Sequence, residues 1–231
     1  MTRPNERIIV ALDVSREDEA LSLVDRLAGR VSRFKVGLQL YTAAGPEIVR
    51  KIVATGAKVF LDLKLHDIPN TVEGAVHSAR TLGVEMLTIH LGGGGPMIRA
   101  ALEAAEDRVI IVGVTVLTSH NDETLGAIGC NEGVEKQVLR LAKLGVDGGI
   151  RALVASPREA ATLRAEFGDQ MKIITPGIRP AGSASGDQKR VTAPRDAIEA
   201  GADFLVIGRP IVADPHPLSA VDKIIAEIGS I

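Results

Sequence analysis

The sequence predicts a parallel (β/α)8 barrel, and three observations indicate this fold class. Eight short apolar runs rich in β-branched residues recur along the chain, with helix-like stretches rich in Ala, Leu, Glu and Arg between them. Strict alternation of this kind is typical of a parallel sheet. The 231 residues allow about 29 for each of eight units, enough for a strand, a helix and two short loops. The sequence ALDVSRED stands where a doubly wound sheet would carry G-x-G-x-x-G, so we expect one closed barrel domain over residues 1–231.

The expected strands can be followed in order along the chain. They are the apolar runs at 8–14, 33–40, 58–65, 86–91, 109–117, 150–156, 171–178 and 204–211. Helical periodicity follows them, most clearly at 16–29 and 217–229. The longest run nearly free of polar residues, 109–117, is far shorter than the roughly 20 residues that span a bilayer.

Glycines mark the expected joints between a helix and the next strand. Gly56, Gly83, Gly145 and Gly201 are each followed by Ala or Val and one further residue before an apolar run. Glycine just after a helix adopts the left-handed conformation that ends the helix without a Cβ clash. The repeated joint therefore predicts one repeated βα unit.

Composition excludes several classes of protein. Hydrophobic residues make up 45% of the chain and charged residues 24%, with a net charge of −2, four Phe, one Tyr and no Trp, so we expect no nucleic-acid partner. The first apolar run reaches Asp13 after five residues, which is too short for a signal peptide, and we expect no membrane association. The single cysteine, Cys130, cannot form an internal disulfide, which predicts a cytoplasmic location.

Two segments are too long for the compact repeat. Residues 118–133 follow the fifth expected strand and are polar, and residues 179–193 follow the seventh and are rich in Gly, Ser and Ala. Both would lie at the carboxyl face of a barrel, where active sites of this fold are found. The second segment is a candidate lid, whereas the first is either a lid or a tolerated surface insertion.

Charged residues stand in the third expected strand, where a barrel should be apolar. Phe60, Asp62 and Lys64 share one face if side chains alternate strictly along the strand. Asp62 and Lys64 would then point into the barrel near its carboxyl mouth, where unpaired charges are costly. The first strand adds Asp13 and the second adds Lys35 on the corresponding face.

These four groups, with Asp67 in the following loop, allow two interpretations. They form either a salt-bridge cluster that only fills the barrel or a catalytic site. Ionisable groups at three consecutive strand ends favour chemistry. Alternating acids and ammonium groups also keep one another charged, which prepares a lysine to donate a proton at neutral pH.

The end of the last expected strand indicates an anion site. Gly208 lets a backbone N–H approach an oxygen closely, and Arg209 can bind the same anion with two hydrogen bonds. Loops after the seventh and eighth strands commonly bind phosphate in this fold. Arg179 and Gln188, in the preceding loop, would close over the same group. The alternative is that Arg209 is an incidental exposed arginine.

The histidines and the cysteine predict no metal site. The five histidines include no H-x-x-x-H pair, and one cysteine cannot form a cluster. His90, at the end of the fourth expected strand, is more readily a structural histidine than a ligand.

The segment 62–71 carries a specific resemblance. It reads DLKLHDIPNT and resembles the D-x-K-x-x-D-I-P-N-T signature of the orotidine 5′-monophosphate decarboxylases of bacterial type. Further matches to that family follow in order along the whole chain. They are ALD at 11–13, FKVG at 34–37, TVLTS at 115–119, PGIRP at 176–180, DQKR at 187–190 and IGRPI at 207–211.

The resemblance implies a reaction and an assembly. The enzyme would convert orotidine 5′-monophosphate to uridine 5′-monophosphate and CO2, the last step of de novo pyrimidine nucleotide synthesis, without metal or cofactor. Lys64 would protonate C6 of the pyrimidine, with Asp62 beside the substrate carboxylate and Lys35 next to it. Asp67 would complete the charged array, and Thr71 would reach the ribose, both from the partner subunit of a homodimer with shared active sites.

The resemblance also implies which residues bind the substrate. Asp13 and Lys35 would approach the ribose, and Thr118 the pyrimidine, while Gln188, Arg209 and the Gly208 backbone would hold the phosphate, with Arg179 closing beside them. The implied substrate-binding residues are Asp13, Lys35, Asp62, Thr71, Thr118, Arg179, Gln188, Gly208 and Arg209.

Two other functions remain open at this point. The 3-keto-gulonate-phosphate decarboxylases and hexulose-phosphate synthases share D-x-K-x-x-D and use Mg²⁺, but their motif continues Asp-Ala-Gly, whereas Asp67 is followed here by Ile-Pro-Asn-Thr. A catalytically silent phosphosugar- or nucleotide-binding barrel would have little reason to keep Lys35, Asp62, Lys64 and Asp67 together. The sequence therefore favours the decarboxylase.

Overall fold

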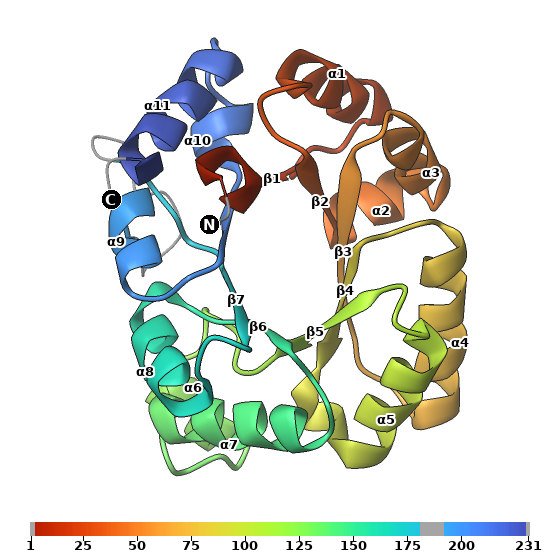
Figure 1. Cartoon of the computed structure of the whole chain (residues 1–231). Helices are drawn as coiled ribbons and strands as arrows, with labels where there is room; N and C mark the ends of the chain where they lie inside the picture. The colour runs from red at the N-terminus through yellow and green to blue at the C-terminus, as the bar shows by residue number, and fades with distance from the viewer. Residues whose placement is uncertain (1–2, 181–191, 230–231) are drawn as a thin grey trace.

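A closed barrel of parallel strands forms the centre of the molecule, and helices surround it (Figure 1). The computed structural model describes residues 3–180 and 192–229. The strands are β1 (Ile8–Ala11), β2 (Arg33–Gly37), β3 (Lys58–Leu65), β4 (Met86–His90), β5 (Ile110–Val114), β6 (Ala152–Val154), β7 (Lys172–Thr175) and β8 (Phe204–Ile207). Each strand pairs in parallel with the next, and β8 pairs with β1. The predicted fold class is confirmed.

Helices cover the outside of the barrel. They are α1 (Glu17–Leu27), α2 (Leu38–Ala44), α3 (Glu47–Ala54), α4 (Pro69–Thr81), α5 (Gly94–Ala105), α6 (Asp122–Ala127), α7 (Val134–Asp147), α8 (Pro157–Phe167), α9 (Pro194–Glu199), α10 (Arg209–Val212) and α11 (Pro217–Gly229), with the 3-10 turns η1 (Pro4–Arg7) and η2 (Leu91–Gly93). In the described part of the chain, none of these helices has the length and apolar character needed to cross a membrane.

The strand β3 matches its predicted run, and the other seven strands are shorter than the apolar runs that predicted them. The runs at 33–40 and 204–211 end in the short helices α2 and α10 instead of continuing as strands. Leu40 and Ile211 are fully buried in those helices. An apolar run reports burial, and burial alone does not distinguish a strand from a buried helical turn.

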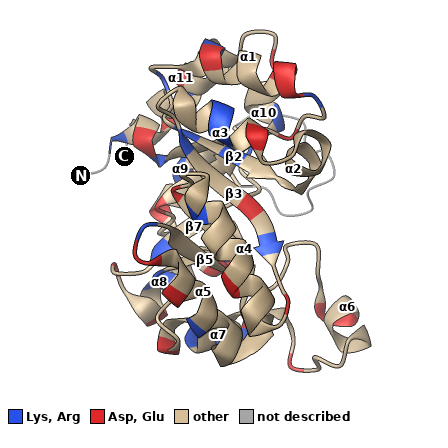
Figure 2. Cartoon of the chain, turned by 90° about the vertical axis from the view of Figure 1, so that its right-hand side faces the viewer, with Lys and Arg blue, Asp and Glu red and all other residues tan. Residues whose placement is uncertain are grey.

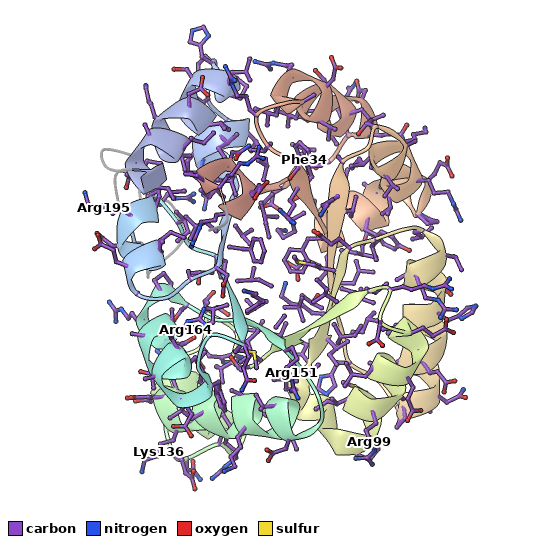
Figure 3. The ribbon with its side chains drawn as sticks, viewed as in Figure 1. Phe34, Arg99, Lys136, Arg151, Arg164 and Arg195 are labelled. Atoms are coloured by element: carbon purple, nitrogen blue, oxygen red, sulfur yellow. The ribbon has the colours of Figure 1, made fainter. Side chains whose placement is uncertain are left out.

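Two apolar layers hold the barrel together. One lies inside it, where side chains fill the centre (Figure 3), and consists of Ile9, Ala11, Phe60, Met86, Val112, Ala152, Ile174 and Val206. The other lies between the strands and the helices and includes Phe34, which is 1% exposed. The inner layer closes the barrel below its carboxyl mouth, so a site at the mouth has an apolar floor.

Three of the four predicted glycine joints are confirmed, and one is wrong. Gly56, Gly83 and Gly201 have φ values of 86°, 77° and 102°. Gly145 instead lies inside α7, and the left-handed glycine of that joint is Gly149, with φ 107°. A Cβ on Gly145 would lie 3.0 Å from Leu91 Cδ1, so close packing of α7 on η2 explains a glycine at this position.

The structure describes the first of the two long segments completely and the second only at its ends. Residues 118–133 contain α6, which Figure 2 shows standing apart from the barrel wall, and the Asn121 side chain accepts the Thr124 N–H at its start (2.9 Å). In the second segment, residues 181–191 lie outside the described residues, and with them the predicted lid. The Arg179 N–H donates to the Thr192 carbonyl at 3.0 Å, which joins the two ends of that segment.

An ion network joins three strands at the amino end of the barrel. Glu85, just before β4, accepts hydrogen bonds from Arg33 Nε at 2.8 Å and from Lys58 Nζ at 2.9 Å. Burial by itself would raise the pKa of Glu85, but the hydrogen bonds and charges of Arg33 and Lys58 outweigh it and hold this pKa below its usual value. The ionised carboxylate therefore stabilises the fold above the ordinary glutamate pKa, and this contribution is lost as the pH falls through the lowered value.

We expect Glu85→Gln to lower the free energy of unfolding at neutral pH by about 1–3 kcal/mol, because Arg33 and Lys58 lose their charged partner. The loss should shrink as the pH falls through the lowered pKa of Glu85, because the wild-type carboxyl then loses its own charge. Urea unfolding of both proteins at neutral pH and at a series of lower pH values measures this. An equal loss at every pH would show that the charge of Glu85 is irrelevant to stability.

Candidate active site

Four charged side chains alternate in sign across the carboxyl mouth of the barrel. Lys35, from β2, donates from Nζ to Asp13 Oδ1 at 3.1 Å and lies 3.7 Å from Asp62 Oδ2. Lys64, from β3, donates from Nζ to Asp62 Oδ1 at 2.7 Å. Figure 2 shows the acidic and basic positions at the carboxyl end of β3. We call Asp13, Lys35, Asp62 and Lys64 the charged chain.

Asp62 is the most enclosed acid of the charged chain. Its side chain and that of Lys35 are each 12% exposed, whereas that of Asp13 is 51% exposed. Burial by itself would raise the pKa of Asp62, but the ammonium groups of Lys35 and Lys64 and the hydrogen bonds to Asp62 outweigh it and hold this pKa below its usual value. Asp62 is therefore a carboxylate at neutral pH, held between two ammonium groups.

The backbone at Lys64 differs from the predicted strict alternation. Lys64 has φ 52°, in the left-handed region that residues with a Cβ seldom adopt. The register between β3 and β4 shifts, with Leu61 opposite Leu87 and then Leu65 opposite Ile89. Lys64 reaches the mouth through this irregularity, and an irregularity of this kind changes the direction of a side chain beside a site.

Thr88, on β4, is a member of the site that sequence reasoning missed. It is fully buried, its Oγ1 donates to Asp62 Oδ1 at 3.0 Å, and the same oxygen accepts the Lys64 backbone N–H at 2.8 Å. A signal was available, because Thr88 follows Met86 by two residues in the run MLTIHL and so takes an inward position that should be apolar.

Two adjoining hollows meet at the charged chain. They share Lys35 and Asp62 together with Pro176 and Val206. One, of about 150 Å³, is otherwise lined by Phe60, Lys64, Val114, Val116, Leu117, Thr118, Val154, Ser156 and Ile174. The other, of about 210 Å³, is otherwise lined by Ala11, Asp13, Gly177, Ile178, Arg179, Gly208 and Arg209. The first suits a flat ring with an apolar face, and the second suits an anion.

Two glycines leave room for the charged chain. A Cβ on Gly37 would lie 2.8 Å from Lys35 Nζ, so a larger residue would displace that ammonium group. A Cβ on Gly208 would lie 3.2 Å from Asp13 Oδ2. Gly208 was predicted to bind phosphate, whereas no role was predicted for Gly37, whose contact appears only when the strand is folded.

The residues predicted to bind phosphate differ in their burial. Arg179 is buried, at 9% exposure, and Arg209 is exposed at the start of α10. Both line the second hollow with Gly208. Gln188 lies outside the described residues. Thr118 is exposed and lines the first hollow.

Asp67 and Thr71 do not join the charged chain of their own subunit. All residues from 66 to 71 are exposed, and the Ile68 side chain is 66% exposed. Asp67 accepts the Ile68 N–H at 2.7 Å, and within the described ranges it forms no ion pair with Lys35 or Lys64. Pro69 begins α4, a position that suits proline because the first helical N–H needs no partner.

His90 lies beside the site and packs against another histidine. The His66 and His90 rings are 5.3 Å apart at their centroids. Burial lowers the pKa of His90, and the nearby His66 and Lys64 lower it further. A neutral, packed ring agrees with the structural role expected for this residue.

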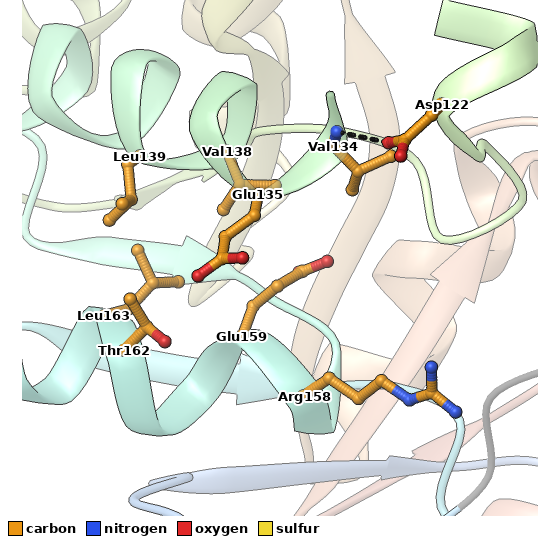
Figure 4. A pocket seen from close by; sticks show the side chains of 9 residues that line it. All are labelled: Asp122, Val134, Glu135, Val138, Leu139, Arg158, Glu159, Thr162 and Leu163. Carbon is orange, nitrogen blue, oxygen red and sulfur yellow. Dashed lines mark hydrogen bonds between the residues drawn. The ribbon is translucent and has the colours of Figure 1, made fainter. Parts of the chain in front are cut away.

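A separate hollow of about 310 Å³ lies between α7 and α8 (Figure 4). Its lining includes Glu135 and Glu159 but no member of the charged chain. Glu159 accepts the Ser156 N–H at 2.8 Å and so caps the amino end of α8. The Val134 N–H donates to Asp122 Oδ1 at 2.8 Å at its edge. This hollow is therefore distinct from the site at the barrel mouth.

Comparison with known proteins identifies the family. The family model described as "Orotidine 5'-phosphate decarboxylase / HUMPS family" matches residues 6–224. A protein of Idiomarina loihiensis named orotidine 5′-phosphate decarboxylase is 48% identical over 227 residues, covering 96% of this chain and 98% of that protein. A protein of the same name from Geotalea daltonii is 46% identical over 236 residues, covering 99% of each.

A solved structure agrees with these relatives. The crystal structure of orotidine 5′-phosphate decarboxylase from Lactobacillus acidophilus superposes with a TM-score of 0.86 at 34% identity, covering 96% of this chain and 99% of that one. The resemblance expected from the segment 62–71 is thus confirmed over nearly the whole length, together with the eight-stranded barrel. This chain belongs to the orotidine 5′-phosphate decarboxylase / HUMPS family.

Proposed function

We propose that the protein converts orotidine 5′-monophosphate to uridine 5′-monophosphate and CO2, with Lys64 as the proton donor. The observation that carries this proposal is the charged chain, which sets the Lys64 ammonium beside Asp62 in a hollow that adjoins an arginine-lined one. The full-length relatives named orotidine 5′-phosphate decarboxylase support the same substrate and the place of the reaction in pyrimidine nucleotide synthesis.

The chemistry requires a fixed positive charge near C6. When the bond from C6 to the carboxylate breaks, its electron pair stays on C6 in the plane of the ring, where the ring π system cannot delocalise it. The Lys64 ammonium stabilises this charge as it forms, and one of its protons then moves to C6. Uridine 5′-monophosphate and CO2 result, with neutral Lys64 regaining a proton from solvent.

Repulsion between Asp62 and the substrate carboxylate makes a smaller contribution. Two charges about 4 Å apart at an effective dielectric constant of about 20 repel by roughly 4 kcal/mol. Enzymes commonly lower barriers by roughly 8–23 kcal/mol, so repulsion alone is insufficient. The larger share comes from the preorganised Lys64 ammonium and from phosphate binding that holds the nucleotide in place.

The two hollows divide the substrate between them. The pyrimidine occupies the hollow lined by Lys64 and Thr118, and the phosphate occupies the one lined by Arg179 and Arg209. The ribose lies between them, near Asp13 and Lys35. Gly208 and Gln188 complete the phosphate site in this proposal.

The reaction proceeds without a metal ion in this proposal, because ammonium groups already occupy the surroundings of Asp62. Its Oδ1 accepts from Lys64 and Thr88, and its Oδ2 faces Lys35. The test follows the absorbance of orotidine 5′-monophosphate before and after dialysis against a chelator. Turnover that survives dialysis supports the proposal. Turnover that disappears and returns with Mg²⁺ favours the Mg²⁺-dependent sugar-phosphate branch.

We further propose a homodimer in which each active site receives Asp67 and Thr71 from the partner subunit. Two observations support this arrangement: Asp67 is exposed and outside the charged chain of its own subunit, and the neighbouring Ile68 presents apolar surface. A two-fold interface would bury both copies of this segment.

We also propose that residues 1–231 act as a single domain in the cytoplasm. The uninterrupted family match over residues 6–224 supports one domain. The single, free Cys130 is compatible with a reducing compartment.

Arg209→Ala is expected to lower kcat/KM for orotidine 5′-monophosphate by about 10- to 150-fold, the value of a charge-assisted hydrogen-bonding group. Turnover of orotidine, which lacks the phosphate, should change by less than about threefold. Steady-state kinetics with both substrates measures the difference, and Arg26→Ala, on the exposed face of α1, is the control. Equal losses for the two substrates would place Arg209 outside the phosphate site.

A further inference from the structure

We propose that Thr88 is a positioning residue that holds Lys64 and Asp62 in their reactive arrangement. Thr88 lines neither of the two hollows at the barrel mouth, so it acts through the two residues that do. The activity part of this inference rests on the proposed decarboxylase function, whereas its structural part does not.

The hydroxyl of Thr88 joins the two reactive residues through one atom. Thr88 Oγ1 donates a hydrogen bond to Asp62 Oδ1 at 3.0 Å, and the same oxygen accepts the Lys64 backbone N–H at 2.8 Å. Asp62 Oδ1 also accepts from Lys64 Nζ at 2.7 Å. Thr88 is fully buried, so water cannot replace the hydroxyl without a change in packing.

The position of Thr88 opposite the β3 irregularity explains why a hydroxyl is needed there. Between the pairs Leu61–Leu87 and Leu65–Ile89, three residues of β3 face the single residue Thr88. The regular ladder is interrupted over this stretch, and the Thr88 side chain supplies the acceptor for the Lys64 N–H.

The left-handed backbone of Lys64 depends on such an acceptor. A residue with a Cβ keeps a φ of 52° only when its surroundings hold it there. Loss of the Thr88 oxygen leaves a buried N–H without a partner, and the segment 62–64 relieves this by rotating toward ordinary strand geometry. The Lys64 ammonium then moves relative to Asp62, and a misplacement of about 1 Å can cost about 10²-fold in rate.

The test compares Thr88→Val, which keeps the shape and removes the hydroxyl, with Thr88→Ser, which keeps the hydroxyl. Thr175→Val is the matched control, because Thr175 is also fully buried in a strand and, among the described residues, its hydroxyl has no hydrogen-bond partner. We expect Thr88→Val to lower kcat by about 10- to 100-fold, with KM and the dissociation constant of uridine 5′-monophosphate changed by less than about threefold. Thr88→Ser should recover kcat to within about threefold of wild type, and Thr175→Val should be unaffected.

Two results of these kinetic measurements would overturn the inference. One is wild-type kcat in Thr88→Val. The other is a parallel loss of kcat, nucleotide affinity and thermal stability that Thr88→Ser does not restore, since that pattern marks a purely structural residue. If Thr88→Val does not fold, the smaller Thr88→Ala serves for the same comparison of kcat with KM.

A crystal structure of Thr88→Val tests the positioning separately from activity. We expect Lys64 to leave the left-handed region and its Nζ to move away from Asp62 Oδ1. An unchanged Lys64 backbone would overturn the inference even if the wild-type enzyme is an active decarboxylase. If the wild type does not decarboxylate the nucleotide but Lys64 moves as expected, the proposed function fails and the positioning role of Thr88 stands.

Discussion

Lys64→Ala is expected to lower kcat for orotidine 5′-monophosphate by at least about 10³-fold. A positioned general acid contributes about 10²–10⁴-fold, and the same ammonium also stabilises the charge that develops on C6. The affinity for uridine 5′-monophosphate should change by less than about tenfold, because Lys64 makes its main interaction in the transition state. Absorbance kinetics gives kcat, and calorimetric titration with the product gives the affinity.

The control for this experiment is a lysine in an ion pair away from the site. Lys172 donates to Asp203 Oδ1 at 3.1 Å at the amino end of β7. Lys172→Ala removes a charge of the same kind, and its kcat should match that of wild type. A loss in Lys64→Ala smaller than about 10²-fold, the low end for one positioned acid, would assign proton donation to another group.

The second large effect is the recovery of activity from two inactive variants. Lys64→Ala and Asp67→Asn should each be nearly inactive alone, since each homodimer has two damaged sites. In a mixed dimer with sites shared between subunits, one site carries both changes and the other carries neither. Random one-to-one exchange makes about half of the dimers mixed, so about a quarter of wild-type activity should appear.

A reciprocal mixture sharpens this test. Wild type mixed with the double variant Lys64→Ala/Asp67→Asn starts at about half of wild-type activity and should fall to about a quarter as subunits exchange, because every site of a mixed dimer is damaged. If both residues act within one subunit, the first mixture stays inactive and the second stays at half. Native mass spectrometry confirms that exchange has occurred in both mixtures.

The structure makes the shared-site model specific about Asp67. Among the described residues, Asp67 forms no ion pair with Lys35 or Lys64 of its own subunit, and its carboxylate accepts the N–H of its neighbour Ile68. Ile68, which is 66% exposed, leaves apolar surface in water, and a second subunit packed on this segment would remove that surface from water. The mixing experiment therefore tests whether Asp67 of one subunit acts with Lys64 of the other, whereas the oligomeric state alone would show only that two subunits associate.

Much of the site could be read from the sequence, because local patterns encode it. Asp13, Lys35 and Asp62 occupy inward positions of short apolar runs, and the charge at such positions is visible without knowing the partners. The segment 62–71 carried the family resemblance, and the Gly208-Arg209 pair marked the second hollow. Parallel strands of a barrel end at the same face, so residues at three strand ends had to meet.

The failures share one cause, which is that contacts between elements far apart in the sequence cannot be read from either element alone. Strict alternation predicted the direction of Lys64 but not its left-handed backbone, since the irregularity exists only in the register of β3 against β4. Thr88 is recognisable in the sequence as a polar residue in an apolar run, but its two hydrogen-bond partners, Asp62 and Lys64, come from another strand. Gly145 resembled a helix end, and only the packing of α7 against Leu91 explains it.

The sequence by itself determined the repeated βα unit, the number of strands and the charged residues at the mouth, because periodicity and composition act over neighbouring residues. The tertiary structure alone decided how Lys35 fits above Gly37 and how Thr88 joins Asp62 to Lys64. It also decided that Asp67 is exposed and accepts the Ile68 N–H instead of pairing with the lysines of its own charged chain. These features depend on distances of a few ångströms between residues far apart in the chain. Such distances follow from strand register and close packing, which local preferences do not specify.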